Sequence, residues 1–332
     1  MAKQQTDILK QPLPTLLVCY ATLMVVLTLR AQRIEGGSRA LFPLSPLGEW
    51  VDGVLAGGWG VATVVVEVLL GSIIITRITG RYSLSVIRSF VPMVLYVVAV
   101  CGVILPVWSP SLTLALLMLV VAAEQNIQSF RRSEQFGYVM TASFWTGLAV
   151  LLVPDLVYTA LLLPLQWIIW QRSPREMVAG VVMFLLPLLP TSFCWWVGGK
   201  EPLWLVGEWA HSLSPLEGAP WGDMPSLVGG VLSLILWGFV VVLALAGALI
   251  YAVSYGDMRI RARKGHAYFA ALFALSLLMC VAGVSVGISV PLMGFASVPL
   301  IYTFFTRRKG VLSTVVYVVL LLLCLSIGIV CY

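Results

Sequence analysis

Apolar segments long enough to cross a lipid bilayer recur along this whole chain, and short loops separate them. About 20 apolar residues span the hydrocarbon core of a membrane as a helix. Hydrophobic residues make up 60% of the chain, charged residues only 10%, and the mean hydropathy is +1.01. A soluble chain carries about 25% charged residues, because its surface must face water. We therefore expect an all-α fold: a polytopic transmembrane helical bundle without a separate soluble domain.

The apolar pattern predicts eleven spans in one integral membrane domain that covers residues 1–332. The expected spans are residues 13–29, 59–76, 90–108, 111–123, 137–153, 156–170, 177–197, 226–255, 267–287, 290–305 and 311–330. Those between residues 111 and 170 are short for a crossing, so we expect them to be untilted or to extend into flanking polar residues.

Basic residues fall almost entirely into every second loop. With the amino terminus in the cytoplasm, sixteen Lys and Arg residues lie on the inner side. The other four, Arg30, Arg33, Arg39 and Lys200, lie on the outer side. Cytoplasmic loops of membrane proteins carry such an excess of positive charge. We therefore predict a cytoplasmic amino terminus and, with eleven spans, a carboxyl terminus outside.

The net charge of +6 does not indicate a nucleic-acid partner, because the basic residues lie beside apolar spans. There they set the orientation and face anionic lipid headgroups, so membrane lipids are the expected partners. The six cysteines form no CxxC motif and no cluster with histidine. The sequence thus indicates neither a disulfide framework nor a structural zinc site, and it specifies no cofactor.

Two loops are long enough to hold a functional surface, residues 30–58 and residues 198–225, and both are predicted to lie outside. The first contains the stretch PLSPLGEWVDGVL, which is typical of a short amphipathic helix at the membrane interface. Eight of the fourteen acidic residues map to the outer side: Glu35, Glu49, Asp52, Asp155, Glu201, Glu208, Glu217 and Asp223.

Glu67 is the one acidic residue that we place deep in a span. A carboxylate in hydrocarbon is costly, so we expect Glu67 to face other helices. Such a residue often marks an ion, proton or substrate path, and the alternative is a packing role with a nearby Ser or Thr partner.

Among the outer residues, Asp52 and Glu49 are the candidate catalytic acids, as a general base or as metal ligands, provided that they converge. Arg30 and Arg33 are the candidate groups for binding a substrate phosphate, together with Glu67 as a substrate-binding residue. Neither HExxH nor a Ser/His/Asp order is present, and each outer acid, as well as His211, is by itself better explained as a solvated loop group. Tryptophans also gather on the outer side, as an interfacial belt or as the lining of a groove for an acyl chain or a sugar.

Residues 77–190 carry a resemblance to a known family. The motifs are EQNIQSFRR, with Asn126 and Arg131, then the helix segment GLAVLLVP ending at Pro154, and the turn RSPRE, with Arg175 and Glu176. This order resembles an uncharacterised family of multi-pass inner-membrane proteins of Bacteroidota. The resemblance implies the bacterial inner membrane and a role in the cell envelope, and it implies no activity.

The layout is more distantly similar to the C-type glycosyltransferases, which use polyprenyl-phosphate sugars at the outer membrane face. The shared features are a cytoplasmic amino terminus, a first outer loop with an interfacial helix and acidic residues, and a series of short helical hairpins. The resemblance implies a polyprenyl-phosphate-linked substrate, although the strong acidic motif of that family's loop is missing here. The competing hypothesis is a non-catalytic protein: a permease or flippase component that uses Glu67, or a scaffold with envelope protein partners.

Overall fold

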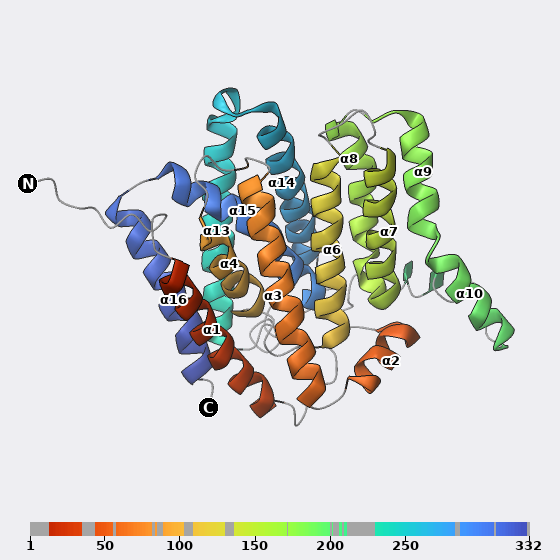
Figure 1. Cartoon of the computed structure of the whole chain (residues 1–332), viewed down its shortest axis with the longest axis horizontal. Coiled ribbons are helices and arrows are strands. Elements are labelled where there is room, and N and C mark those ends of the chain that lie inside the picture. Colours follow the sequence, from red (N-terminus) through yellow and green to blue (C-terminus); the bar gives the residue numbers. More distant parts are fainter. Residues whose placement is uncertain are drawn as a thin grey trace, which may run out of the picture.

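The computed structural model describes residues 13–34, 44–55, 58–81, 84, 89–102, 109–129, 136–170, 172–199, 201, 206–207, 209–210, 230–282, 286–308 and 310–330 (Figure 1). Every regular element in these ranges is a helix, which confirms the all-α class. The helices are α1 (Leu13–Ile34), α2 (Pro46–Val54), α3 (Gly58–Arg81), α4 (Val91–Tyr96), η2 (Val97–Cys101), α6 (Pro110–Gln128), α7 (Phe136–Leu152), η4 (Pro154–Leu161), α8 (Leu162–Trp170), α9 (Pro174–Leu185), α10 (Leu188–Val197), α13 (Val231–Val253), η6 (Tyr255–Asp257), α14 (Ile260–Val281), α15 (Val286–Arg307) and α16 (Val311–Val330).

Six helical segments in the described ranges are long and apolar enough to cross a membrane, and α9 and α10 together count as one of them. The others are α3, α6, α13, α14 and most of α15. Shorter apolar helices lie within α1, α4 with η2, α7 and α16. The protein is therefore a helical chain suited to a membrane, while the count of eleven spans and the orientation stay predictions.

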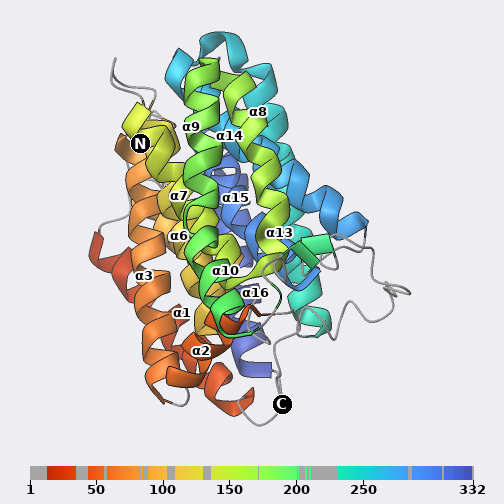
Figure 2. The ribbon, with the colours of Figure 1, turned by 90° about the vertical axis from the view of Figure 1, so that its right-hand side faces the viewer.

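The helix α15 forms the centre of the bundle, with α13, α14, α4 and η2 packed around it (Figures 1 and 2). The apolar stretch of α15, within Gly287–Arg307, is completely buried inside the protein. It contains Pro291 and Pro299, which remove backbone donors from the helix. Such prolines are tolerated in a membrane helix when neighbouring helices surround it and local side chains satisfy freed backbone groups. The core of this protein is thus a helix that touches other helices instead of lipid.

Close approach of backbones holds α15 against its neighbours. A Cβ atom added at Gly247 of α13 would lie 2.1 Å from the carbonyl oxygen of Leu300. A Cβ atom at Gly294 of α15 would lie 2.3 Å from the carbonyl oxygen of Ala99 in the π-helical turn η2. Small residues allow such approach in membrane proteins, where van der Waals packing replaces the hydrophobic effect as the force between helices.

The short spans expected between residues 111 and 170 differ from the helices observed. The predicted span 111–123 becomes the 19-residue helix α6, because Ser109 caps its start and it runs on through polar residues to Gln128. The predicted span 156–170 divides into the 3₁₀ helix η4 and the α-helix α8. The predicted span 177–197 begins at Pro174 and is interrupted at Leu186 and Pro187, after which α10 leans away from the bundle (Figure 1).

The basic end of the bundle, at the top in Figure 1, is where α3 and α6 end and where α9 and α14 begin. It carries Arg81, Arg172, Arg175 and Arg259. The opposite end holds α2 and the starts of α3 and α6 (Figure 1).

The helix predicted in the first long loop is present as α2, and α1 extends through Ile34 into the range expected to be loop.

Candidate functional site at the start of α6

The helix α2 is fixed against the start of α6 and the end of α7. The Ser45 hydroxyl caps α2 by accepting a hydrogen bond from the Gly48 N–H at 3.1 Å, and Pro46 is its first residue. The Ser45 N–H donates to the Leu152 carbonyl at the end of α7, at 3.3 Å. A Cβ atom at Gly48 would lie 2.6 Å from the same carbonyl oxygen. One face of α2 is therefore packed on the bundle.

Asp52, on α2, binds the first turn of α6 with both carboxylate oxygens. Its Oδ2 accepts a hydrogen bond from the Ser109 hydroxyl at 2.7 Å, and its Oδ1 accepts one from the Ser111 N–H at 2.9 Å. The Ser111 hydroxyl also contacts Oδ1. The first N–H groups of a helix lack partners within the helix and favour negative charge nearby. Asp52 thus caps α6 from a different helix and is no solvated loop group.

Glu67 lies on α3 and is buried, with 6% of its surface exposed. Its Oε2 accepts a hydrogen bond from the hydroxyl of Thr113, in the same first turn of α6. The prediction that Glu67 faces other helices is therefore confirmed. Asp52 also lies close enough to Glu67 to act on it electrostatically. The start of α6 thus brings together two of the predicted site residues, and we call Asp52, Glu67, Ser109, Ser111 and Thr113 the α6 cluster.

Both central hydroxyls of the α6 cluster have a second acceptor. The Ser111 hydroxyl lies 2.7 Å from the Gly48 carbonyl oxygen as well as against Asp52. The Thr113 hydroxyl lies 3.1 Å from the Pro110 carbonyl oxygen as well as against Glu67. A hydroxyl carries one proton and two lone pairs, so each can donate to the carboxylate or turn its proton to the carbonyl. Each carboxyl group can therefore be hydrogen-bonded in its charged and in its protonated form.

The other predicted site residues lie elsewhere. Glu49 is on the exposed side of α2, beside the exposed Trp50. Arg30 and Arg33 belong to α1, but their side chains lie outside the part of the chain that the structure describes, as does His211. In the described residues no three His, Cys, Asp or Glu side chains come together in a way that could hold a metal ion. The catalytic role of Asp52 and Glu49 was conditional on their convergence, and the acid that shares the start of α6 with Asp52 is Glu67.

Three polar residues at or beyond the ends of the predicted spans are buried, and for Asp155 the prediction of a solvated loop group was wrong. Asp155, expected to be a solvated loop acid, opens η4 with 4% of its surface exposed. Glu124 is buried near the end of α6 and pairs with Arg77 of α3 at 2.8 Å. His266 lies inside α14, where its ring nitrogens are 2.8 Å from the Ala262 carbonyl oxygen and 2.7 Å from the Thr303 hydroxyl. Each lies near an end of its helix, where a sequence does not show whether a turn faces water or a neighbour.

A second polar group joins the ends of α6, α8 and α14 at the basic end. Arg172 is buried, contacts the Ser129 hydroxyl and lies 3.4 Å from Glu176. Burial lowers the pKa of Arg172 from its ordinary value, and Glu176 opposes this effect. The Arg172 guanidinium lies 5.9 Å from the ring centre of Trp170, which stacks on Tyr268. Because these contacts join residues of the bundle to one another, their evident role is to hold the helix ends together.

The fold is that of a helical protein suited to a membrane. Its candidate site consists of two carboxyl groups that are hydrogen-bonded by hydroxyls at the start of α6. Comparisons with protein-family models, with curated proteins and with solved structures found no match to this chain. The functional argument therefore depends on the α6 cluster itself.

Proposed function

We propose that the protein is a membrane permease or flippase component that binds a proton at the carboxyl pair of Asp52 and Glu67 during transport. The observation that carries the proposal is the second acceptor of each hydroxyl, Gly48 for Ser111 and Pro110 for Thr113. A hydroxyl with two possible acceptors can bond a carboxyl group in both its charged and its protonated form. Asp52 also acts electrostatically on Glu67, and like charges near one another repel.

The position of the two acids suits entry of a proton from one side of the membrane. Asp52 is half-buried on α2, at the end of the bundle. Glu67 is buried on α3, one helical turn after Thr63 and so further from the start of that helix. The hydroxyls of Ser111 and Thr113 follow each other along the first turn of α6 between the two acids. A proton taken up at Asp52 would have to cross this turn to reach Glu67, because no hydrogen bond among the described residues joins the Ser111 contacts to those of Thr113. Intramembrane acids of this kind form the proton relays of pumps and transporters.

The direct oxygen–hydrogen contacts favour a proton over a metal ion. The Ser109 hydroxyl lies 2.7 Å from Asp52, and the Thr113 hydroxyl contacts Glu67 directly. Metal ions such as Ca²⁺ need six to eight oxygen ligands around a space of their own. A proton needs only the hydrogen bonds that are already formed.

Infrared difference spectroscopy of the protein in lipid tests the proposal, because a protonated carboxyl group has its own carbonyl band. We expect a band that rises and falls with pH in the wild type, that is lost in Glu67→Gln and that shifts in Thr113→Val. Glu201→Gln, at an exposed position, is the matched control and should keep the band. An unchanged band in Glu67→Gln would refute a proton site at Glu67.

Proteoliposomes with a pH-sensitive dye inside test the transport step. An imposed membrane potential should drive proton entry through the wild type and through Glu201→Gln, and Glu67→Gln should reduce the flux to the level of empty vesicles. Equal flux in Glu67→Gln and the wild type would show that protons cross without this residue, and the permease proposal would then fail.

A second candidate is an envelope enzyme of the glycosyltransferase type, acting on a polyprenyl-phosphate-linked substrate at the outer face of a bacterial inner membrane. The observation that favours it is the free side of α2, where Glu49 is exposed beside Trp50, whose surface is 64% exposed. A ring and an acid on one exposed helix suit a sugar or a lipid headgroup. Arg30 and Arg33 would then supply the phosphate contact.

Complementation of the envelope defect of a deletion strain separates the two candidates. The enzyme requires Asp52 or Glu49 as base, so Asp52→Asn or Glu49→Gln should abolish function at unchanged abundance, with Glu217→Gln as control. The permease requires Glu67 and tolerates Glu49→Gln. Loss of function by none of these substitutions would favour a scaffold with envelope protein partners.

A further inference from the structure

A pocket of about 410 Å³ lies beside the last turns of α3, at the basic end of the bundle and away from the α6 cluster. Its apolar walls come from Ile73 of α3 and from Phe90 and Met93 at the start of α4. Ile73 and Phe90 are each about half exposed. Specific ligand pockets have volumes of about 300–1,000 Å³, so this space is large enough for part of a lipid.

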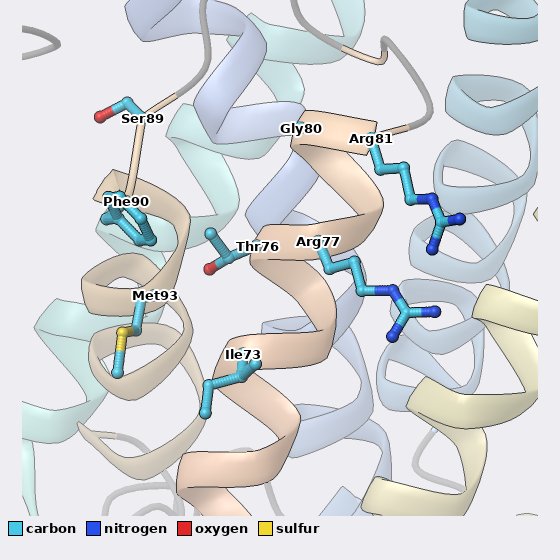
Figure 3. A pocket seen from close by; sticks show the side chains of 8 residues that line it. All are labelled: Ile73, Thr76, Arg77, Gly80, Arg81, Ser89, Phe90 and Met93. Atoms are coloured by element: carbon cyan, nitrogen blue, oxygen red, sulfur yellow. The ribbon is translucent and has the colours of Figure 1, made fainter.

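Two arginines, Arg77 and Arg81, also line the pocket, together with Thr76, Gly80 and Ser89. Arg77 and Arg81 extend from α3 in the same direction, one helical turn apart, while Phe90 and Met93 lie on the other side of the helix (Figure 3). Gly80 lies between these two sides, and a Cβ atom added there would meet nothing within 4 Å. The chain thus leaves an open passage over Gly80, from the cations to the apolar walls.

The charges of this region are complementary to an anion. Within the described residues Arg81 is exposed and forms no ion pair. Arg77 pairs with Glu124 through its Nε atom, and a guanidinium has further N–H donors on its two terminal nitrogens. None of the described residues that line the pocket is acidic. A phosphate group held by two guanidinium groups forms strong, charge-assisted hydrogen bonds, whereas a cationic headgroup finds no partner here.

We infer that this pocket binds an anionic phospholipid, with the phosphate at Arg77 and Arg81 and one acyl chain passing over Gly80 to lie against Ile73, Phe90 and Met93. The apolar walls favour a lipid over a free phosphate ion, because they can contact an acyl chain but provide no hydrogen-bond partner for an ion. The position suits the cytoplasmic leaflet expected at the basic end, where anionic lipids collect. This site shares no residue with the α6 cluster and stands whether or not the protein moves protons.

Native mass spectrometry of the detergent-purified full chain tests the inference by titration with dioleoylphosphatidylglycerol or dioleoylphosphatidylcholine. We expect tighter binding of the anionic lipid, and affinity reduced roughly fivefold by Arg81→Gln, since one basic residue is lost. Gly80→Leu should also reduce binding, because its side chain closes the passage, and its thermal midpoint should not fall since Leu favours helix more than Gly. The control is Arg308→Gln, an exposed arginine at the end of α15, which should bind the lipid as the wild type does.

Three results would overturn the inference. The first is wild-type affinity of Gly80→Leu for phosphatidylglycerol, which would show that no chain passes over Gly80. The second is displacement of the lipid by millimolar inorganic phosphate, which would show that only the headgroup is held. The third is an equal loss in Arg81→Gln and Arg308→Gln, which would reduce the effect to net charge.

Discussion

The backbone N–H of Ser111 donates a hydrogen bond of 2.9 Å to the Asp52 carboxylate, although 59 positions of the chain separate the two residues. Through this contact a short surface helix, α2, provides the negative charge that the start of α6 requires. The same turn of α6 also receives Glu67 from α3. A single helix start therefore joins three helices and holds two acids through its own first residues.

Replacing Asp52 by Ala should destabilise the protein by about 0.5–2 kcal/mol, the range measured for loss of a helix cap. The substitution leaves the Ser111 N–H without its acceptor. Thermal unfolding in detergent measures the effect, with Glu49→Ala on the exposed side of α2 as control. Equal midpoints for the two variants would contradict the capping role.

Replacing Thr113 by Val keeps the shape of the side chain and removes the donor to Glu67. We expect a loss of about 1–3 kcal/mol in the free energy of unfolding, because the buried carboxyl group loses its partner. Combining Thr113→Val with Glu67→Leu should cost less than the two single changes added together. Additive losses in this double-mutant cycle would show that the two side chains do not interact.

Replacing Gly247 by Ala should separate α13 from α15, because the new methyl group would lie 2.1 Å from the Leu300 carbonyl oxygen. Overpacking of this kind typically costs about 1–3 kcal/mol. Gly238, on the same helix, has nothing within 4 Å of an added Cβ atom. Gly238→Ala should be neutral or slightly stabilising, since Ala favours helix more than Gly. Thermal midpoints of the two variants should thus move apart, and a shared midpoint would argue against the tight crossing.

Replacing Arg77 by Gln leaves the buried Glu124 without its cation. A fully buried pair broken in this way loses about 3–5 kcal/mol. The Arg77 side chain is 49% exposed, so water screens the pair and we expect about 1–2 kcal/mol. The double variant Arg77→Gln with Glu124→Gln should recover part of the loss, as measured by thermal unfolding. A double variant that is less stable than Arg77→Gln would mean that Glu124 is held mainly by other groups.

The sequence determined the class of this protein and the burial of Glu67. Apolar segments must leave water, and a carboxylate within one must leave lipid, so both conclusions follow from the cost of transfer between phases. The helix α2 was also predictable, because Ser45 and Pro46 are a local start signal and its exposed side carries Trp50.

Only the tertiary structure decided which polar residues meet. Asp52 reaches Ser111, and Arg77 reaches Glu124, because helices distant in the sequence pack side by side. It also decided that α15 is the buried centre, a helix whose apolar composition resembles that of its neighbours. The hydropathy of a segment indicates how strongly it avoids water. It does not indicate whether lipid or another helix takes the place of water around the segment. That choice depends on close contacts such as Gly247 against Leu300, which exist only once the helices are assembled.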